Sequence, residues 1–310
     1  MHTKDFISIH NLTVEEVHRL FDLTKEMKAR REKFSNALAG KILALIFEKP
    51  SLRTRVSFEV GIRQLGGSAV YLSPSEIQMR KRESVPDVGK TLERMVDGIM
   101  IRTFGHEIVL ELAGAVRIPV INGLTDLLHP CQVMADYFTI LEKRENLRGL
   151  KVVFVGDGNN VCHSLMFGAA KLGVDFWAAT PKGYEPKREI IQPANEDARA
   201  TGARIHVVND PQEAVRNADV VYTDVWASMG QETEAETRKK SFLPYQVNKK
   251  LFSLAKPDAL FLHCLPAHRG EEVTDDVIDS SNSVVFDEAE NRLHVQKAIM
   301  YELMRQRLRC

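Results

Sequence analysis

Short apolar runs of strand length alternate with amphipathic runs of helix length along almost the whole chain. Parallel strands require such crossover connections, so the alternation predicts an α/β protein whose parallel sheets carry helices on both faces. In the first half we expect strands near 41–47, 68–72, 98–103 and 118–122, and helices near 13–33, 54–65, 86–96, 106–115 and 130–145. In the second half we expect strands from 151 onwards and near 174–179, 205–208, 219–224, 259–263 and 284–286, before a last helical run over 292–307.

A polar stretch at 142–149 divides this pattern into two parts. A chain of 310 residues is long enough for two ordinary α/β domains. We therefore expect two doubly wound parallel-sheet domains, covering 1–146 and 147–289, followed by an amphipathic helical segment at 290–310.

Composition argues against several kinds of partner. Lys+Arg and Asp+Glu both total 42, so no basic excess indicates nucleic acid. No apolar run approaches the roughly 18 residues that a membrane span needs, and the N-terminal residues lack the apolar core of a signal peptide. We therefore expect no membrane association. The four cysteines, which are Cys131, Cys162, Cys264 and Cys310, are scattered along the chain. Such spacing is typical of reduced thiols in a cytoplasmic protein.

A zinc site is a candidate because three histidines, His129, His163 and His263, each lie within two residues of a cysteine. However, the chain contains no C-x-x-C pair. Successive residues of a strand point to opposite faces, so His263 and Cys264 would not share one ion. We therefore expect no metal.

The segment Ser51–Arg55 lies where an apolar strand-like run becomes a helical run. Ser51 has the side chain of an N-cap, which would place backbone N–H groups and the positive helix end toward a ligand. Arg53 and Arg55 add two guanidinium groups, and Thr54 adds a hydroxyl. These residues are typical of a site for a phosphate-sized anion, although a capped helix with two solvated arginines would explain them equally well.

Three further segments accompany this turn, and each lies next to a predicted strand or helix. They are D-L-L-H-P-C-Q at 126–132, D-V-W-A-S-M-G at 224–230 and H-C-L-P-A-H-R-G at 263–270. Together with the S-x-R-T-R turn, and in this order over nearly the whole chain, they resemble the signature of the aspartate/ornithine transcarbamylase family, and within it of the ornithine carbamoyltransferases.

The resemblance implies transfer of the carbamoyl group from carbamoyl phosphate to the side-chain amine of L-ornithine. The products would be L-citrulline and phosphate, in arginine biosynthesis or, in reverse, in arginine catabolism, with no cofactor. It also implies that 1–146 binds carbamoyl phosphate, that 147–289 binds ornithine, and that the helix at 290–310 packs back on the first domain. Two interdomain helices would then join the domains.

Residue by residue, the resemblance implies two sets of ligand contacts. Those for carbamoyl phosphate are Ser51, Leu52, Arg53, Thr54, Arg55, Gln78, Arg102, His129, Gln132, Leu265 and Arg292. Those for ornithine are Asn160, Asp224, Ser228, Met229 and Cys264. Arg102 and His129 would polarise the carbonyl, and Asp224 and Cys264 would orient the amine, so these four are the predicted catalytic residues. Gln78 would come from a neighbouring subunit, which implies a homotrimer or a multiple of trimers.

Other interpretations account for parts of the sequence. Gly156-Asp157-Gly158 is similar to the start of a dinucleotide-binding fingerprint, but Val161 stands where its third glycine belongs. Arg102 and Arg292 could be ordinary surface arginines, and Cys264 a buried small side chain. A carbamoyltransferase for a related amine such as putrescine, or a paralogue that binds carbamoyl phosphate without turnover, would share most of the motifs. Leu52 departs from the threonine common in the family, but this position contributes mainly its backbone amide.

Overall fold

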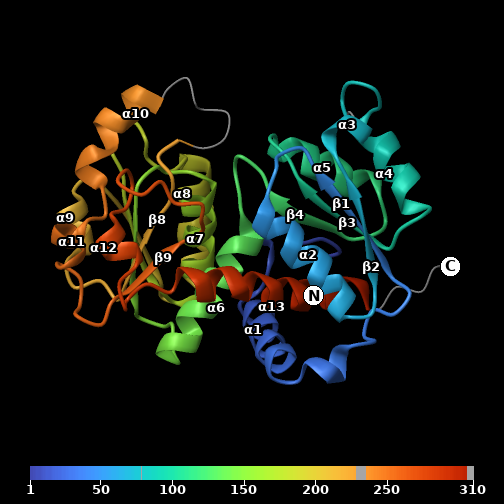
Figure 1. The fold of residues 1–310 in the computed structure, drawn as a ribbon, viewed down its shortest axis with the longest axis horizontal. Coiled ribbons are helices and arrows are strands. Elements are labelled where there is room, and N and C mark those ends of the chain that lie inside the picture. Colours follow the sequence, from blue (N-terminus) through green and yellow to red (C-terminus); the bar gives the residue numbers. More distant parts are fainter. Residues whose placement is uncertain (78, 228–234, 306–310) are drawn as a thin grey trace. The chain divides into compact units, whose positions relative to one another are not determined.

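The structure, a computed structural model, describes residues 1–77, 79–227 and 235–305 and contains two compact units (Figure 1). One unit comprises Met1–Ala135 with Glu290–Cys310, and the other comprises Asp136–Ala289. Each unit is built on one parallel sheet with helices on both faces, which confirms the predicted fold class. The helices α6 (Pro130–Arg144) and α13 (Val285–Met304) each contain residues of both units, as expected for two connecting helices.

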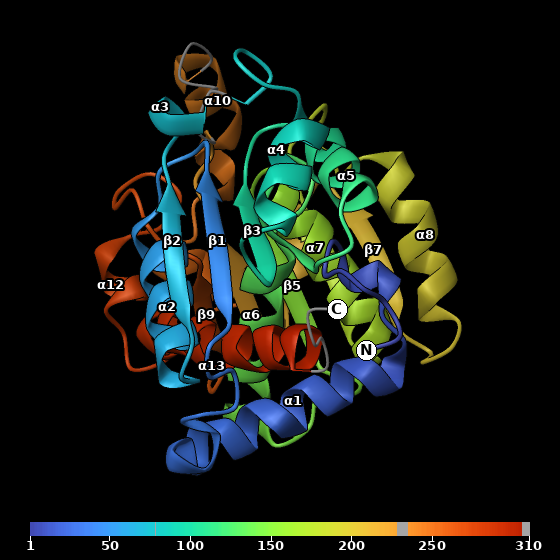
Figure 2. The same cartoon turned by 90° about the vertical axis from the view of Figure 1, so that its right-hand side faces the viewer.

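The sheet of the first unit has four parallel strands in the order β2-β1-β3-β4. They are β1 (Ile42–Phe47), β2 (Ser68–Leu72), β3 (Gly98–Arg102) and β4 (Val120–Leu124), and Figure 2 shows β2, β1 and β3 side by side. Phe47 pairs with Arg102 in register, so the carboxyl ends of β1 and β3 meet. The strand order reverses between these two strands, and open α/β sheets bind ligands at such a switch point.

Helices cover both faces of this sheet. The apolar side chains of Ala44, Ile46 and Ile99 form one core with those of α4 (Val85–Glu93) and α5 (His106–Ala115). On the other face, a Cβ added at Gly98 would contact both Leu43 and Met304 of α13. The remaining helices of this unit are α1 (Val14–Ala29), α2 (Leu52–Gln64) and α3 (Pro74–Ile77).

The sheet of the second unit has five parallel strands in the order β7-β6-β5-β8-β9. Val155 of β5 pairs with Thr223 of β8, so the loops that begin at Gly156 and Asp224 leave the same edge of the sheet at its switch point. The strands are β5 (Lys151–Val155), β6 (Asp175–Ala179), β7 (Arg204–Val208), β8 (Val220–Thr223) and β9 (Leu260–His263).

In this unit Val153, Val155 and Val221 share a core with the short helices α9 (Pro211–Val215), α11 (Lys249–Phe252) and α12 (Asp275–Ile278). Phe154 and Tyr222 have the opposite parity along their strands and stack with ring centroids 5.9 Å apart. The helices α7 (Asn160–Leu172) and α8 (Arg188–Ala198) pack against each other, and α7 contacts β6 and β7. This unit also contains α10 (Ala235–Phe242).

Two turns at the amino ends of these strands contain glycines with left-handed backbones. Gly149, before β5, has φ 79° and Gly202, before β7, has φ 78°. Only glycine adopts this conformation without strain, which explains its presence in both turns. A Cβ added at either position would meet nothing within 4 Å, so both turns face open space.

The predicted strand at 284–286 is wrong. Val285 begins α13, and only the preceding Ser283 forms an isolated bridge, with Phe261. The apolar run S-V-V-F is short enough to fit either element, but Asp287 and Glu288 place acidic side chains in the first turn of the helix, which favours a helix start. The helix predicted over 13–33 likewise ends at Ala29 and is followed by a 3-10 turn at Arg31–Phe34. Within the described ranges no helix has both the length and the apolar composition that a membrane span requires.

Candidate active site

Ser51 is the N-cap of α2, as the sequence predicts. Its backbone is extended, with φ −164°, and its Oγ accepts a hydrogen bond from the Thr54 N–H at 3.2 Å. The first N–H groups of a helix have no acceptor within the helix, and the positive end of the helix dipole lies beside them. Because Ser51 closely follows β1, this anion-attracting helix end lies at the switch point of the first sheet.

The two arginines of this turn have different surroundings. The positive charge of Arg53 is one of the causes that lower the pKa of His129. Arg55 instead donates from Nε to Glu59 at 2.9 Å, and its Cζ lies 3.7 Å from the centroid of the Tyr71 ring. Its side chain is 46% exposed. The Arg55 guanidinium therefore already has partners in α2 and β2, and its contact with carbamoyl phosphate stays a prediction.

His129 is buried directly before α6. A tight turn precedes it, in which Thr125 N–H donates to the Leu128 carbonyl at 2.8 Å and Leu128 N–H donates to Thr125 Oγ1 at 3.1 Å. Burial lowers the pKa of His129 well below 6.5, and the positive charges of Arg292, Arg102 and Arg53 lower it further. The imidazole is therefore neutral near pH 7, in the form that donates one hydrogen bond without carrying charge.

Arg292 is buried and links predicted residues of the first unit. It donates from Nη1 to Gln132 Oε1 and from Nη2 to Thr54 Oγ1 at 3.1 Å. The Gln296 carbonyl accepts from Nε and Nη2 at 2.9 Å in the amide orientation that lets its nitrogen donate to Ser57. Arg292 is therefore not the surface arginine that the sequence left as an alternative. Arg102, which ends β3, is also buried.

The sequence analysis missed a buried lysine in the same unit. The Lys49 side chain is only 4% exposed, donates from Nζ to Asp126, and lies with Nζ 4.3 Å from the centroid of the Phe104 ring. It thereby joins the loop before Ser51 to the loop before His129. The sequence signal was its place inside F-E-K-P-S, but a lysine next to a proline gives no indication of burial.

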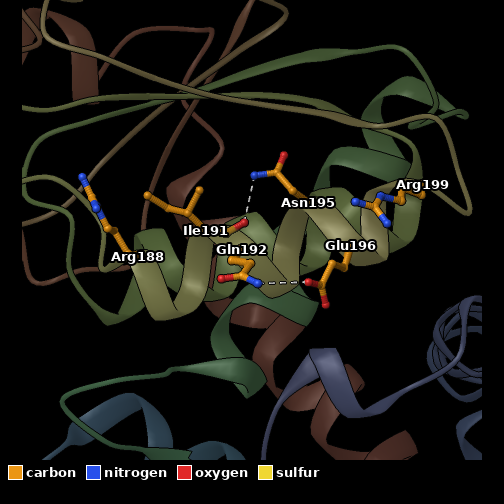
Figure 3. A pocket seen from close by; sticks show the side chains of 6 residues that line it. All are labelled: Arg188, Ile191, Gln192, Asn195, Glu196 and Arg199. Carbon is orange, nitrogen blue, oxygen red and sulfur yellow. Dashed lines mark hydrogen bonds between the residues drawn. The ribbon is translucent and has the colours of Figure 1, made fainter.

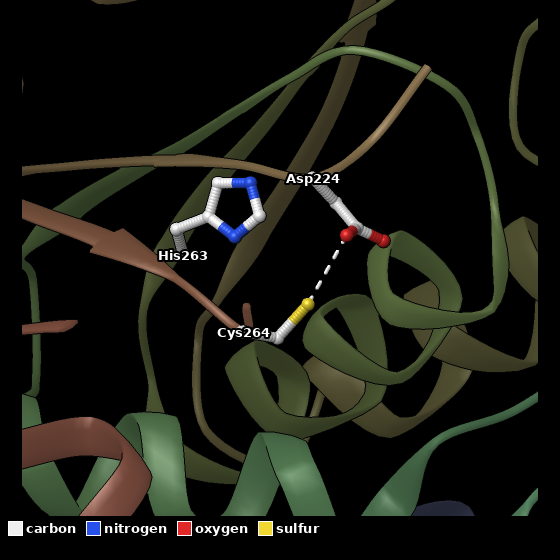
Figure 4. Close-up of side chains that lie close together, drawn as sticks. All are labelled: Asp224, His263 and Cys264. Atoms are coloured by element: carbon white, nitrogen blue, oxygen red, sulfur yellow. Dashed lines mark hydrogen bonds between the residues drawn. The ribbon is translucent and has the colours of Figure 1, made fainter. Parts of the chain in front are cut away.

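In the second unit Asp224 and Cys264 form a hydrogen-bonded pair (Figure 4). Asp224 Oδ1 accepts from Cys264 Sγ at 3.1 Å and from the Val225 N–H at 2.9 Å. Burial, followed by the negative charge of Asp224, raises the pKa of the Cys264 thiol well above 9.0. The thiol is therefore a hydrogen-bond donor at neutral pH and not a thiolate nucleophile.

His263 uses both ring nitrogens inside the protein. Nδ1 accepts from the Leu265 N–H at 2.9 Å, and Nε2 lies 3.1 Å from Glu272 Oε1. Because Nδ1 is an acceptor, Nε2 carries the proton and donates to the carboxylate. Leu265 has φ 56°, a left-handed conformation that is costly for a leucine. The bond to His263 contributes to holding it there.

The argument that His263 and Cys264 cannot share an ion was wrong in its geometry. β9 ends at His263, so strand alternation does not extend to Cys264, and one potential ligand atom from each of Asp224, His263 and Cys264 lies within 4.8 Å of the others. The donor set nevertheless does not suit a metal. The imidazole nitrogens are both engaged and the thiol is protonated, whereas metals bind thiolates and free imidazole lone pairs.

The other predicted residues fall in two groups. Asn160 begins α7 at the carboxyl end of β5, on the same sheet edge as Asp224. Gln78, Ser228 and Met229 lie outside the described residues. A surface hollow of about 420 Å³ runs along α8 and is lined by none of the predicted residues (Figure 3); its lining is Arg188, Ile191, Gln192, Asn195, Glu196 and Arg199.

Comparison with known proteins assigns the family. The family description "Aspartate/ornithine carbamoyltransferase, carbamoyl-P binding domain" matches residues 4–142, and "Aspartate/ornithine carbamoyltransferase, Asp/Orn binding domain" matches residues 148–303. The chain belongs to the aspartate/ornithine carbamoyltransferase family. The ornithine carbamoyltransferase of Thermococcus kodakarensis is 55% identical over 97% of this chain and 96% of its own length. That of Carboxydothermus hydrogenoformans is 56% identical over 97% of both chains.

A solved structure gives the same result. The ornithine carbamoyltransferase from Pyrococcus furiosus superposes with a TM-score of 0.95 at 53% identity, covering 98% of each chain. The family and fold that the motifs predicted are therefore confirmed.

Sequence reasoning missed two residues of the second carbamoyltransferase unit. Asn159 Nδ2 donates to Asp224 Oδ2 at 2.8 Å. Arg238 is buried and donates from Nη1 to Asp157 Oδ2 at 2.8 Å and to the Trp226 carbonyl at 2.9 Å. Asn159 precedes the predicted residue Asn160, but no motif assigned it a role of its own. Arg238 lies in a polar segment rich in Glu, Thr and Lys, a composition that is typical of an exposed loop.

Proposed function

We propose that the protein transfers the carbamoyl group of carbamoyl phosphate to the side-chain amine of L-ornithine, forming L-citrulline and phosphate. The observation that carries the proposal is the Asp224–Cys264 pair, which places a fixed carboxylate beside a protonated thiol at the switch point of the second sheet. A carboxylate and a neutral thiol suit an amine, whereas an aspartate substrate would need cations for its two carboxylates. The family assignment and the names of the relatives support the same reaction.

We propose that the first unit holds carbamoyl phosphate. The N-terminus of α2 would bind the phosphate with the Ser51 hydroxyl, the Leu52 and Thr54 amides and Arg53. Arg102 would contact both the phosphate and the carbonyl oxygen. Arg55 would reach the phosphate only by leaving Glu59 and Tyr71, so we expect it to contribute less to the affinity for carbamoyl phosphate than Arg53 does.

His129 would act on the carbonyl of carbamoyl phosphate. Its lowered pKa leaves it neutral, so it can donate a hydrogen bond to the oxygen that gains negative charge as the amine attacks. A neutral donor does not repel the nearby arginines. Arg292 would orient Gln132, which with the Leu265 carbonyl would hold the carbamoyl NH₂.

The second unit would hold ornithine. Asp224 and Cys264 would orient its side-chain amine, and Asn160, Ser228 and Met229 would hold its amino-acid end. Since the Cys264 thiol stays protonated, it cannot accept the proton of the ammonium. The amine would therefore lose its proton to solution or to another base before it attacks.

One assay tests the activity and separates it from its alternatives. Phosphate release and the carbamoylated product of each amine are measured with carbamoyl phosphate and, in parallel, ornithine, aspartate or putrescine at equal concentration. We expect ornithine to be the preferred substrate. Preference for putrescine would replace the proposed substrate, and binding of carbamoyl phosphate without product from any amine would indicate a non-catalytic paralogue.

We also propose a homotrimer or a multiple of trimers. Leu52, Val56 and Val60 are 73%, 50% and 37% exposed and follow one another at four-residue spacing, so they form a single apolar stripe on α2. Val70, on the edge strand β2, is also 46% exposed. An apolar stripe of this kind is typical of a contact surface between proteins.

Light scattering tests the assembly. Val56→Glu should reduce the mass of the particle, whereas Leu110→Glu, at an exposed leucine of α5, should not. Mixing inactive Arg53→Ala and Gln78→Ala proteins should restore some activity if a neighbour supplies Gln78, because a hybrid then contains a complete site. A fully active monomer would contradict the proposal.

We propose a cytoplasmic location for the protein. Three cysteines, Cys131, Cys162 and Cys264, carry free thiols in the structure, which supports a reducing compartment. Cell fractionation with an antibody to the protein would test this.

A further inference from the structure

We propose that Asn159 is a positioning residue that fixes the carboxylate of Asp224 for the incoming amine. The proposal rests on the proposed function, because it takes Asp224 as the group that receives the ornithine side chain. Asn159 lies between β5 and α7, at the switch point of the second sheet. The family resemblance assigns its neighbour Asn160 to ornithine and gives Asn159 no role.

The orientation of the Asn159 amide is fixed by its own hydrogen bonds. As the N-cap of α7, Asn159 accepts with Oδ1 from the N–H groups of Val161 at 3.0 Å and Cys162 at 3.1 Å. An amide nitrogen could not replace this oxygen, because it would face two donors. Nδ2 must therefore point away from the helix end, and it donates to Asp224 Oδ2 at 2.8 Å.

This bond is one of three that the described residues donate to Asp224. Its Oδ1 already accepts from the Val225 N–H and from Cys264 Sγ, so both carboxylate oxygens are held. Without Asn159, the Oδ2 atom would lose the donor that sets its direction. Positioning of a catalytic group to within a fraction of an ångström depends on such supporting contacts.

The helix alone does not require an asparagine. Serine, threonine and aspartate begin helices about as well as asparagine does. Aspartate would accept the same two N–H groups, but it would place a second negative charge against Asp224. A serine hydroxyl could accept a hydrogen bond from the helix, but serine has no second polar group that could donate to Asp224. Asparagine combines an acceptor for the helix with a donor for the carboxylate.

A neutral donor also preserves the charge of Asp224. A lysine or arginine in this place would neutralise the carboxylate before an ammonium arrived. The nearby cation, Arg238, instead bonds to Asp157 at 2.8 Å. Within residues 1–77, 79–227 and 235–305, no lysine or arginine forms an ion pair with Asp224. The carboxylate is therefore oriented without losing its attraction for a cation.

The test uses the full-length protein with Asn159→Asp and Asn159→Ser. Both variants keep an N-cap acceptor, and both lose the donor to Asp224. We expect kcat/KM for ornithine to fall on the order of 10- to 100-fold in each, as for the loss of a hydrogen bond to a charged group. The affinity for carbamoyl phosphate, measured by calorimetry, should be unchanged in both variants. The thermal unfolding midpoint should fall in Asn159→Asp, where a second negative charge faces Asp224, and should change less in Asn159→Ser.

The matched control is Asn248→Asp. Asn248 is the N-cap of α11 in the same unit and accepts from the Leu251 N–H at 3.0 Å. This variant makes the same chemical change at a helix that carries no predicted site residue, so its kinetics should equal those of the wild type. A loss in Asn248→Asp equal to that in Asn159→Asp would indicate a general effect on folding and would overturn the positioning role.

The outcomes separate the two proposals. If the wild-type protein makes citrulline and both Asn159→Asp and Asn159→Ser have the same kcat/KM as the wild type, only the role of Asn159 is overturned. Wild-type protein that makes no citrulline would overturn the proposed function, and the role of Asn159 with it. If Asn159→Asp does not fold, Asn159→Ser decides, because it introduces no charge.

Discussion

The protonation state of Cys264 leads to a quantitative prediction for pH dependence. Burial, then the Asp224 carboxylate, then that of Glu288 raise the pKa of this thiol well above 9.0, so it remains a donor across the neutral range. A free alkyl ammonium has a pKa of about 10.4, so roughly one ornithine side-chain amine in 2,500 is neutral near pH 7. If no group of the site takes this proton, the reaction uses only that neutral fraction.

The magnitude follows from the amine alone. Between about pH 6.5 and 9 the neutral fraction rises roughly 300-fold, which corresponds to about 3.4 kcal/mol at 1.36 kcal/mol per unit. We expect kcat/KM for ornithine to rise by a comparable factor. The assay measures citrulline at saturating carbamoyl phosphate and at ornithine concentrations well below KM.

Cys264→Ser provides the control. A serine hydroxyl keeps a donor for Asp224 but cannot ionise in this range, so the slope with pH should persist even if the rate is lower. A flat wild-type profile would refute the reasoning. A slope that disappears in Cys264→Ser would also refute it, because the thiol would then be the base.

The structure supports three further predictions. Arg53→Ala should weaken carbamoyl phosphate binding by about 2–5 kcal/mol in calorimetry, whereas Arg55→Ala, whose guanidinium is half exposed and already paired, should cost no more than about 1 kcal/mol. Equal losses would place both arginines on the phosphate. Arg238→Met should lower the free energy of unfolding, measured in urea, by about 3–5 kcal/mol, because it leaves the buried Asp157 carboxylate without this cation. The double variant Arg238→Met/Asp157→Asn should recover part of that loss. Burial raises the pKa of Glu288 well above 4.5, so its contribution to stability is present below pH 4.5 and is lost as the pH rises through the folded-state pKa. Glu288→Gln should therefore reduce the loss of unfolding free energy on going from acid to alkaline pH. The unfolding free energy is measured by denaturant titration at several pH values, and a dependence on pH equal to that of the wild type would contradict this.

Much of the fold could be predicted because apolar runs and turn residues agree along the chain. Ser51 carried the clearest local signal, since its hydroxyl, the preceding strand and the following helix all indicate an N-cap. The run at 284–286 was misassigned because four apolar or small residues fit a strand and a buried helix equally well. Local pattern alone does not settle such a segment.

The site was predicted less completely, and for a different reason. Motifs identify residues that contact ligands, but supporting residues are defined by three-dimensional neighbours. Lys49 and Arg238 are charged side chains that composition places on the surface, and their burial depends on partners such as Asp126 and Asp157 that the fold brings beside them. The motif likewise gave no indication that Arg55 Nε would donate to Glu59.

The open turns at Gly149 and Gly202 have a practical consequence for studying this enzyme. They lie at the amino ends of β5 and β7, whereas Asp224 and Cys264 follow the carboxyl ends of β8 and β9. A short peptide tag or a fluorescent reporter inserted after Gly202 would therefore extend from the edge of the sheet opposite the proposed chemistry. Because a side chain there would meet nothing within 4 Å, the reporter would report on the second unit without altering the residues proposed to bind ornithine.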